Sequence, residues 1–557
     1  MGYLMFLAAI VLFFLLLITR TYLQSRREEK EYRDRILYHF GEQPPEKVSA
    51  ARKQKIADGY KRRNREFYID DITWKDLQMD EVYDRLAFVE TQAGEESLYE
   101  ILRTPLTDPE LLAQRELQIR YFQEHPRERA ACQMLFHRLS VKKCSRSLYE
   151  QLEQLEKAPE QKAVSDYLAV WLVLFSVIMI LWNFPVGICI MVAVCIYNIL
   201  SYFKRKAEIT PYISCFSYLI LFVKQAEKFP QLTGPWQEDI NKLTNIVNKL
   251  QRLKRGAFLL PEGNIRSSSD PFSVLRDYIN MLLHMDLLFF NHRKKQILMY
   301  KEEAAELIRI TGKIEAFIAI VAFRAGNSGN CIPEYQEKGI MAEGLYHPLL
   351  KKPVANDMNT TDCVLITGSN ASGKSTFLRT AAINVLLAQT VHTCMAKAFA
   401  VPCYRLYTSI SISDDLLNGE STYVAEIRAL KRIIDAAEVK GTPVIAFTDE
   451  ILRGTNTVER IAAAAQILKY LKEEGVFCFA ATHDVELTVL LQKEYHNYHF
   501  TEVVENGEVI FPYQLKDGSV RSRNAIRLLA GMGYDKKITE TAEKMASDFL
   551  EKGVWSC

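Results

Sequence analysis

The sequence predicts a C-terminal α/β domain built around a phosphate-binding loop, preceded by an all-α region that carries membrane-embedded helices. Residues 368–375 read Gly-Ser-Asn-Ala-Ser-Gly-Lys-Ser, a complete G-x-x-x-x-G-K-[ST] phosphate-loop (P-loop) pattern. From Gly339 onward, short apolar runs alternate with helix-length segments, which is typical of a mostly parallel sheet with helices on both faces. Upstream, Leu, Glu, Gln and Arg recur at helical spacing, interrupted by uncharged apolar runs.

Composition narrows the class of protein before any motif is considered. The chain of 557 residues is 48% hydrophobic and 25% charged, which excludes general disorder. Its net charge of +2 gives no chain-wide electrostatic footprint for nucleic acid, so any basic surface has to be local. The 11 cysteines are scattered without a C-x-x-C pair. This pattern indicates neither a disulfide framework nor a zinc site, and it favours a reducing compartment for the soluble parts.

Three apolar segments are predicted to lie in a membrane. The first, Tyr3–Thr19, is uncharged and has neither the basic start nor the small-residue cleavage site of a signal peptide, which favours an uncleaved anchor. The other two, Tyr167–Phe184 and Val186–Phe203, are separated only by Pro185 and are followed by the basic run at 204–206. Each alone resembles a buried core helix, but the tandem arrangement predicts a tight transmembrane hairpin.

Basic residues next to these segments predict the orientation of the chain. Residues 20–65 contain 14 Lys or Arg against 7 Asp or Glu, and such an excess favours the cytoplasmic side. The N-terminus is then outside, and residues 20–165 and the P-loop are inside. We therefore expect a multi-pass protein of the cell membrane with a cytoplasmic ATPase domain. The basic stretch itself is interpreted equally well as a contact for anionic lipid or as a solvated linker.

The P-loop is flanked as a nucleotide site requires. Val364–Thr367 is a buried-strand pattern and Phe377–Thr390 a helix-length amphipathic one, so backbone N–H groups and a helix N-terminus surround one concavity. Lys374 is expected to reach the β- and γ-phosphates of ATP, and the Ser375 hydroxyl to bind Mg²⁺. The predicted nucleotide-binding set is Gly368, Ser369, Asn370, Ala371, Ser372, Gly373, Lys374, Ser375 and Thr376.

Acidic and histidine residues follow two later strand patterns. The run 443–448 ends in Asp449 and Glu450; we expect Asp449 to hold Mg²⁺ through water or Ser375, and Glu450 to orient or deprotonate the attacking water. The next strand leads to His483, predicted to contact the γ-phosphate or that water. Further on, Ser421 opens a helix, and it fits either a simple N-cap or a contact to a phosphate on a partner subunit.

Four runs in order, ITGSNASGKSTFLRTA, STYVAEI, VIAFTDEILRGTNT and FAATHDVEL, make the chain similar to the MutS family of ATPases, within the ABC class. The resemblance is strong from residue 339 onward. It weakens upstream, where DDITWKDLQM and KIEAFIAIVAF are similar to the family's helical core. It implies an ATP hydrolase that uses Mg²⁺ and forms a homodimer with composite sites. It further implies that Ser421 contacts the opposing subunit's γ-phosphate and that Tyr513 supplies an aromatic ring against adenine.

The chain also departs from the family pattern. Ser372 and Leu452 each replace a usual glycine, which removes no catalytic group. Residues 1–65 leave no room for the family's mismatch-reading and connector domains, and the hydrophobic hairpin occupies the place of its DNA clamp. The expected domains are an anchor (1–20), a basic linker (21–65), a first helical core part (66–165), the hairpin (166–204), a second core and lever part (205–338) and the ATPase domain with a C-terminal helical dimerisation motif (339–557).

Two functions remain open at this point. One is a membrane-anchored MutS-like ATPase that still engages DNA. The other is an ATP-driven conformational switch that acts on a membrane or protein partner without mismatch recognition. Because the hairpin replaces the DNA-holding part of the family pattern, the sequence leaves both DNA binding and the identity of a protein partner undecided.

Overall fold

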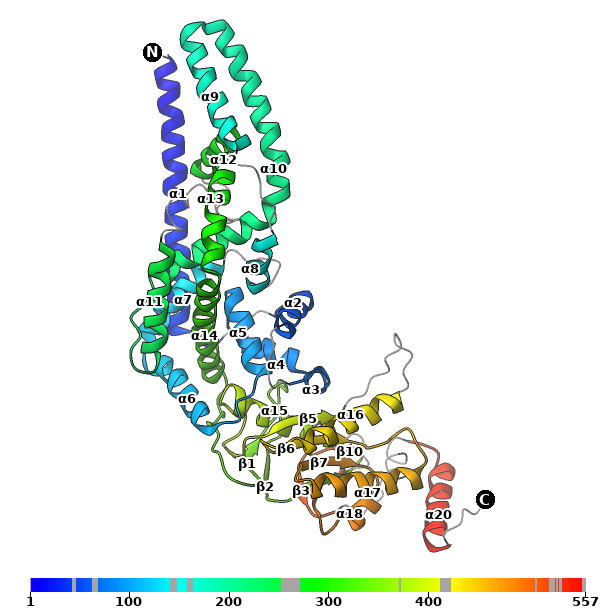
Figure 1. Cartoon of the computed structure of the whole chain (residues 1–557). Helices are drawn as coiled ribbons and strands as arrows, with labels where there is room; N and C mark the ends of the chain where they lie inside the picture. The colour runs from blue at the N-terminus through cyan, green and yellow to red at the C-terminus, as the bar shows by residue number, and fades with distance from the viewer. Residues whose placement is uncertain are drawn as a thin grey trace. The chain divides into compact units, whose positions relative to one another are not determined.

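The computed structural model describes residues 2–42, 47–62, 69–140, 148–157, 164–251, 271–369, 372–410, 422–505, 508–519, 526, 529 and 533–552. The chain forms two compact units, whose elements are labelled in Figure 1. The first, here the helical unit, comprises Met1–Asn64, Asp84–Glu100 and Glu116–Gly326. The second, here the α/β unit, comprises Arg65–Tyr83, Ile101–Arg115 and Asn327–Cys557. The predicted boundary at 338/339 implied a single entry into the α/β unit. The chain instead enters this unit three times.

The described residues of the helical unit form helices and no strand, as expected from their periodicity. They are α1 (Gly2–Tyr38), α2 (Ala50–Lys61), α7 (Pro126–Ser140), α8 (Leu148–Lys157), α9 (Val164–Trp182), α10 (Phe184–Ala226), α11 (Gln237–Leu250), α12 (Pro271–Leu283), α13 (Met285–Met299) and α14 (Lys301–Gly326), with a 3₁₀ turn at Gly234–Trp236. Three more helices run through the boundaries between the units: α4 (Met79–Leu86), α5 (Gln92–Arg103) and α6 (Pro109–Glu124).

Helix α14 forms the centre of the helical unit and is buried along most of its length. At Gly312 an added Cβ would lie 2.4 Å from the carbonyl oxygen of Ala93, so the backbones of α14 and α5 are in direct contact. One turn later, Glu315 accepts hydrogen bonds from the backbone N–H groups of Glu90 (2.6 Å) and Thr91 (2.9 Å). Burial raises the pKa of Glu315 to about 8. Close packing and a buried acceptor thus fix α5 to α14.

Helices α9 and α10 form an antiparallel hairpin (Figure 1). The helices are separated at Asn183, whose side chain accepts a hydrogen bond from the N–H of Val186 (3.4 Å). Pro185 lies inside the first turn of α10, where a missing N–H is harmless, so the predicted break moves from the proline to the asparagine before it. At Gly187 an added Cβ would lie 2.3 Å from the N atom of Ile180, so only glycine lets the two helices approach this closely.

The hairpin is apolar on its outside. Among the described residues, Val164–Trp182 and Phe184–Thr210 are long and apolar enough to cross a membrane, with mean hydropathy of 2.2 and 2.1 and only 17% and 22% of residues buried. Core helices of soluble proteins pass the same length test but are mostly buried. The segment predicted as the first anchor is helical within α1, but most of its side chains lie outside the description, so that anchor stays a prediction.

The α/β unit contains a six-stranded sheet in the order β11-β8-β3-β7-β6-β5, in which only β11 is antiparallel. Its strands are β3 (Cys363–Thr367), β5 (Arg405–Ser409), β6 (Val444–Asp449), β7 (Phe477–Thr482), β8 (Tyr495–His499) and β11 (Lys516–Asp517). A smaller sheet pairs β2 (Asn356–Thr360), β1 (Ile340–Leu345) and β4 (Ala398–Ala400), and β9 (Val503–Glu505) pairs with β10 (Glu508–Ile510). The helices are α3 (Asp71–Asp76), α15 (Lys374–Thr390), α16 (Thr422–Glu438), α17 (Thr457–Glu473), α18 (Glu486–Leu490) and α20 (Lys536–Lys552).

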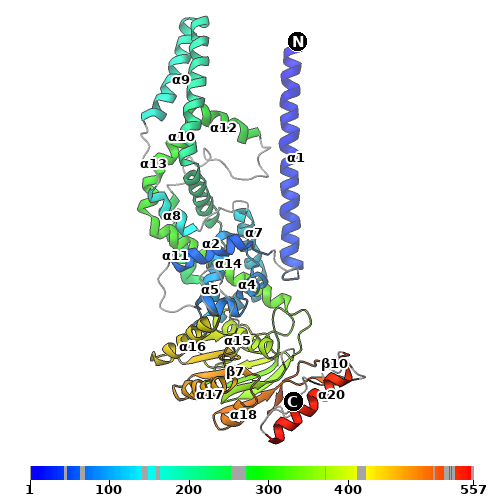
Figure 2. The ribbon, with the colours of Figure 1, turned by 90° about the vertical axis from the view of Figure 1, so that its right-hand side faces the viewer.

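Helices cover both faces of the six-stranded sheet, as the alternating pattern predicted. Side chains of α16 and α17, including Ile433 and Leu468, pack on one face against alternate strand residues such as Ala446. Helix α15 lies on the opposite face (Figure 2). Because both faces are covered, the central strands β3, β7 and β6 are mostly apolar, and β3 is buried at every position.

Short segments from upstream complete the α/β unit. Asp76, at the end of α3, accepts hydrogen bonds from the hydroxyl of Thr408 (2.7 Å) and the N–H of Ile410 (2.9 Å), where β5 ends. Asp70, the N-cap of α3, forms an ion pair with Arg432 of α16 (2.6 Å). These polar contacts explain why residues 65–83 fold with the α/β unit instead of with the neighbouring helices.

Candidate nucleotide site

The carboxyl ends of three parallel strands lie side by side at one edge of the sheet. Strand register pairs Thr367 of β3 with Thr482 of β7, and Ala481 of β7 with Asp449 of β6. The loops that follow these three strands therefore begin next to one another, at the edge where open α/β sheets place their ligand sites.

The P-loop follows β3 and ends where α15 begins. Gly368 has φ +148, and an added Cβ there would lie 2.7 Å from the carbonyl oxygen of Phe500. Gly373 has φ +106 and caps α15, and an added Cβ would meet the ring of Tyr513 at 3.0 Å. Both positions therefore require glycine. Asn370 and Ala371, between them, lie outside the described residues.

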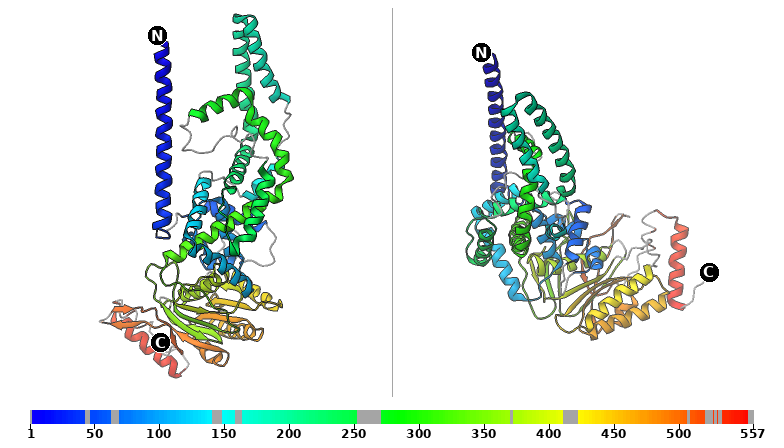
Figure 3. Two further views of the ribbon diagram at one scale, coloured as in Figure 1. Left: turned by 90° about the vertical axis from the view of Figure 1, so that its left-hand side faces the viewer. Right: turned by 45° about the horizontal axis from the view of Figure 1, so that its top comes forward.

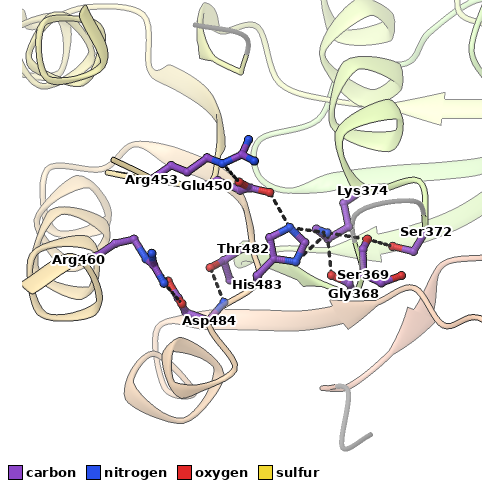
Figure 4. A network of polar contacts seen from close by, with 10 residues as sticks. All are labelled: Gly368, Ser369, Ser372, Lys374, Glu450, Arg453, Arg460, Thr482, His483 and Asp484. Carbon is purple, nitrogen blue, oxygen red and sulfur yellow. Dashed lines mark hydrogen bonds and ion pairs between the residues drawn. The ribbon is translucent and has the colours of Figure 1, made fainter. Parts of the chain in front are cut away.

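Lys374 folds back over the loop (Figure 4). Its Nζ donates hydrogen bonds to the carbonyl oxygens of Gly368 (2.7 Å) and Ser369 (2.9 Å) and lies 3.4 Å from each ring nitrogen of His483. Burial lowers the pKa of Lys374 to about 8, although Asp449 and nearby carboxylates oppose this shift. The ammonium group therefore lies next to the position in which the P-loop is expected to bind phosphate.

Asp449, the first of the two acidic residues at the end of β6, is placed to hold a metal ion. Asp449 is largely buried, its pKa is raised by that burial, and it accepts a hydrogen bond from Ser375. Its Oδ1 atom is buried without a hydrogen-bond partner among the described residues. A hydroxyl beside an unpartnered carboxylate oxygen fits Mg²⁺, which takes few protein ligands and keeps water and phosphate oxygens. When bound, the ion would neutralise phosphate charge.

Glu450 follows Asp449 in a left-handed conformation, with φ +50. Its Oε1 lies 2.5 Å from Nε2 of His483, and its Oε2 forms an ion pair with Nε of Arg453 (3.1 Å), as Figure 4 shows. Both carboxylate oxygens are therefore engaged, one by His483 and one by Arg453. Glu450 and His483 lie together as the sequence suggested, and their catalytic roles stay predictions.

Two features of this region were missed by sequence reasoning. Arg453 holds Glu450 from three residues away, which a charge pattern at helical spacing could have suggested. Next to His483, Asp484 receives two hydrogen bonds from the guanidinium of Arg460 (2.6 and 2.9 Å), and this bidentate pair fixes the turn after β7 (Figure 4).

The remaining predicted residues are placed unequally. Tyr513 lies with its ring against Gly373, and its carbonyl oxygen accepts a hydrogen bond from Asn356 (3.1 Å). It has φ +55, so its adenine contact remains a prediction on a constrained backbone. Thr376 is exposed on the first turn of α15. Ser421 lies outside the described residues, immediately before α16.

A P-loop between a buried strand and a helix, with two carboxylates and a histidine at neighbouring strand ends, defines a P-loop nucleotide-binding domain. A family profile described as MutS domain V matches residues 364–550. Residues 364–550 are therefore similar to the ATPase part of the MutS family.

Curated relatives support the same assignment. The chain is 29% identical over 267 residues to "DNA mismatch repair protein MutS" of Natronomonas pharaonis, which covers 46% of this chain and 31% of the relative. The protein of that name from Thermus thermophilus is 27% identical over 328 residues (57% and 38%). The one from Shouchella clausii is 30% identical over 283 residues (48% and 32%). The matches thus span about a third of the length of these relatives.

The lowered pKa of Lys374 predicts a pH dependence of ATP affinity. The phosphates of a bound nucleotide favour the ammonium form, so the pKa of Lys374 is higher in the complex than its value of about 8 in the free site. Affinity is then complete below pH 8, and falls above it by up to about tenfold per pH unit, because binding requires uptake of a proton. Titration with a fluorescent ATP analogue from pH 7 to 9.5 checks this. Lys374→Arg, which stays charged, should flatten the profile; equal slopes for both proteins would contradict the assignment.

Glu426 of α16 is expected to position Glu450 through the turn between them. Its carboxylate, 7% exposed, accepts hydrogen bonds from the backbone N–H groups of Leu452 and Arg453. Leu452 has φ +59, a conformation that a non-glycine residue adopts at a cost of about 1 kcal/mol or more. We expect Glu426→Ala to release this turn and lower ATP turnover about tenfold, a loss of about 1.4 kcal/mol in transition-state stabilisation.

Steady-state hydrolysis and equilibrium ATP binding, measured on the full chain, separate this effect from general damage. ATP affinity should change less than twofold, because Glu426 is not expected to touch the nucleotide. Glu438→Ala, at the exposed end of the same helix, is the matched control and should leave both quantities unchanged. Unaltered turnover in Glu426→Ala would show that the turn holds Glu450 without this acceptor.

Proposed function

We propose that this chain binds ATP with Mg²⁺ and hydrolyses it at the site formed by the P-loop, Asp449 and Glu450. The observation that carries the proposal is the position of His483 at the P-loop, where it contacts both Lys374 (3.4 Å) and Glu450 (2.5 Å). In this proposal, Lys374 leaves its two backbone acceptors for the phosphates. Glu450 exchanges its contacts with His483 and Arg453 for the attacking water, and His483 contacts the γ-phosphate.

We further propose that two copies close on the nucleotide as a homodimer. In the resemblance that motivates this, Ser421 of one copy completes the site of the other. The start of α16 carries exposed apolar side chains, Val424 (39%) and Ile427 (43%), and the start of α17 carries Val458 (76%). Apolar residues exposed at element ends next to a predicted trans-acting serine support an interface with a second copy.

The α9–α10 hairpin is proposed to anchor the protein in the cell membrane with the α/β unit in the cytoplasm. Its outward side chains are apolar, and aromatic residues stand near both ends, Tyr167 (56% exposed) at the base and Trp182 (82%) at the tip. Such residues favour the two interfaces of a bilayer. The basic run at 204–206 follows the second helix and favours the cytoplasmic side. The apolar segment within α1 is proposed as a further anchor.

Two outputs are proposed for ATP-driven closure. The relatives carry the name "DNA mismatch repair protein", which supports a function on DNA. The second candidate is a conformational switch that acts on a membrane or protein partner, and the specific observation in its favour is the exposed apolar hairpin within the helical unit. The two differ in one measurable property, because DNA binding through phosphate contacts weakens linearly with the logarithm of salt concentration.

The test uses the full chain purified in lipid nanodiscs. Phosphate release that depends on Mg²⁺, together with dimer formation on ATP binding, supports the ATPase proposal; release that persists unchanged in Lys374→Ala would overturn it. Binding of matched and mismatched duplexes is then measured at several salt concentrations with ATP present. Affinity with a salt slope supports the DNA output, and its absence favours the switch. If deletion of residues 166–204 leaves the function of the protein in cells intact, that result counts against the switch.

A further inference from the structure

Helix α12 presents an apolar stripe to the outside of the helical unit. Leu275, Tyr278 and Ile279 are 58%, 59% and 38% exposed, and Leu282 is partly exposed. Their spacing of three and four places them on one face of the helix. The charged Asp277 lies on the opposite face, where Arg276 approaches it at 3.7 Å. A contiguous exposed apolar face on a helix of a folded unit indicates a surface that contacts something other than water.

The C-terminal end of α12 is fixed to the hairpin by buried polar groups. Asn198 of α10 donates hydrogen bonds to the carbonyl oxygens of Leu282 (2.8 Å) and Ala169 (3.1 Å). His284, which follows α12 with φ +52, contacts Asp166 of α9 (3.1 Å). Asn198, His284 and Asp166 have no exposed surface. These contacts tie α12 to both hairpin helices, so its position along the hairpin is defined.

Helix α12 crosses the hairpin instead of running along it, and both Figure 2 and the left view of Figure 3 show it extending sideways from α9 and α10. Its attachment point, Asn198, precedes the end of the apolar span at Phe203 by five residues, or about 8 Å at the rise of an α-helix. Amphipathic helices that lie in a bilayer interface bury their apolar face by about 5–10 Å. The depth and the direction of α12 therefore both match the interface.

We propose that α12 lies in the cytoplasmic interface of the membrane, with Leu275, Tyr278 and Ile279 inserted among lipid acyl chains. This inference rests on the membrane function proposed for the hairpin, and adds a second membrane contact of a different kind. The basic residues 204–206 follow the apolar span directly, where headgroups are expected, and Tyr278 has the amphipathic ring that interfaces favour. In this proposal the hairpin spans the membrane, and α12 lies along its cytoplasmic interface.

Photo-crosslinking on the full chain in native membranes tests this. The photoreactive residue p-benzoylphenylalanine replaces Tyr278 in one variant and Asp277, on the opposite face, in a matched control. A third variant carries it at Trp171 of α9, which is 67% exposed. After irradiation, mass spectrometry of the modified peptides identifies lipid adducts. We expect adducts at 278 and 171, with at least a fivefold lower yield at 277.

The outcomes separate this inference from the function on which it rests. Lipid adducts at 171 without adducts at 278 would overturn the interfacial helix alone and leave the hairpin anchor intact. Crosslinks from 278 to a second copy, or to another segment of the same chain, would overturn it by identifying a different occupant of the stripe. Absence of lipid adducts at both 171 and 278 would overturn the membrane anchor and the interfacial helix together.

Discussion

Replacement of Glu450 by glutamine is expected to slow ATP hydrolysis by about 10²–10⁴-fold, the contribution typical of a positioned general base. The amide is nearly the same size as the carboxylate but cannot accept the proton of the attacking water. Glutamine can still form hydrogen bonds with His483 and Arg453 in place of the carboxylate contacts, so the turn after β6 should keep its shape. ATP binding should therefore persist, and a closed ATP-bound state should accumulate.

Single-turnover hydrolysis and equilibrium ATP binding, measured side by side, distinguish chemistry from binding. Glu459→Gln is the matched control, because Glu459 is an exposed glutamate in the first turn of α17. That variant should hydrolyse ATP at the rate of the unchanged protein. If Glu450→Gln retained full turnover, the water would have to be activated by another group, and His483 would become the first candidate.

The P-loop could be predicted because its requirements are local. The conformations at Gly368 and Gly373 are accessible to glycine alone, and the flanking strand and helix have clear apolar patterns. The α/β character of the C-terminal part followed from the same local signals. The break between the two hairpin helices was predicted at Pro185 but lies at Asn183, two residues earlier. Asn183 caps α10, and a proline in the first turn of a helix does not interrupt it.

The rest depends on contacts between residues that are distant in sequence. Glu426 meets the backbone of Leu452, and Asp76 meets Thr408, without any periodic pattern that joins these positions. The entry of residues 65–83 into the α/β unit follows from such contacts, and so could not be read from composition or spacing. The polar partners of distant residues depend on the folded geometry, whereas a motif such as the P-loop depends on local chemistry and is visible in the sequence.

Replacement of Arg324 by alanine is expected to destabilise the helical unit by about 3 kcal/mol or more, because it leaves a carboxylate buried without its partner. The guanidinium of Arg324, near the end of α14, forms two hydrogen bonds with Glu116 of α6 (2.7 and 3.0 Å). The side chains are only 5% and 7% exposed. Arg120, 3.9 Å from Glu116, is half exposed and can replace the lost charge only in part.

The position of this pair gives the experiment its sharpness. Glu116 is the first residue after one passage of the chain between the units, and Arg324 lies two residues before another. Within the helical unit, the pair therefore links the start of one chain segment of that unit to the end of the same segment. In Arg324→Ala, unfolding of this unit should occur about 6–12 °C lower, at roughly 2–4 °C per kcal/mol for a unit of this size. ATP affinity, a property of the α/β unit, should stay within twofold.

A double replacement separates the charge from the contact. Because two buried charges are removed together, Glu116→Leu with Arg324→Met should recover most of the lost stability and lie within about 1 kcal/mol of the unchanged protein. Thermal unfolding of the full chain in detergent, followed by tryptophan fluorescence to which the buried Trp236 of the helical unit contributes, measures all three proteins. A double variant as unstable as Arg324→Ala would indicate that packing, and not an uncompensated carboxylate, is what Arg324 supplies. Recovery of stability with altered ATP turnover would instead assign the pair to communication along α14.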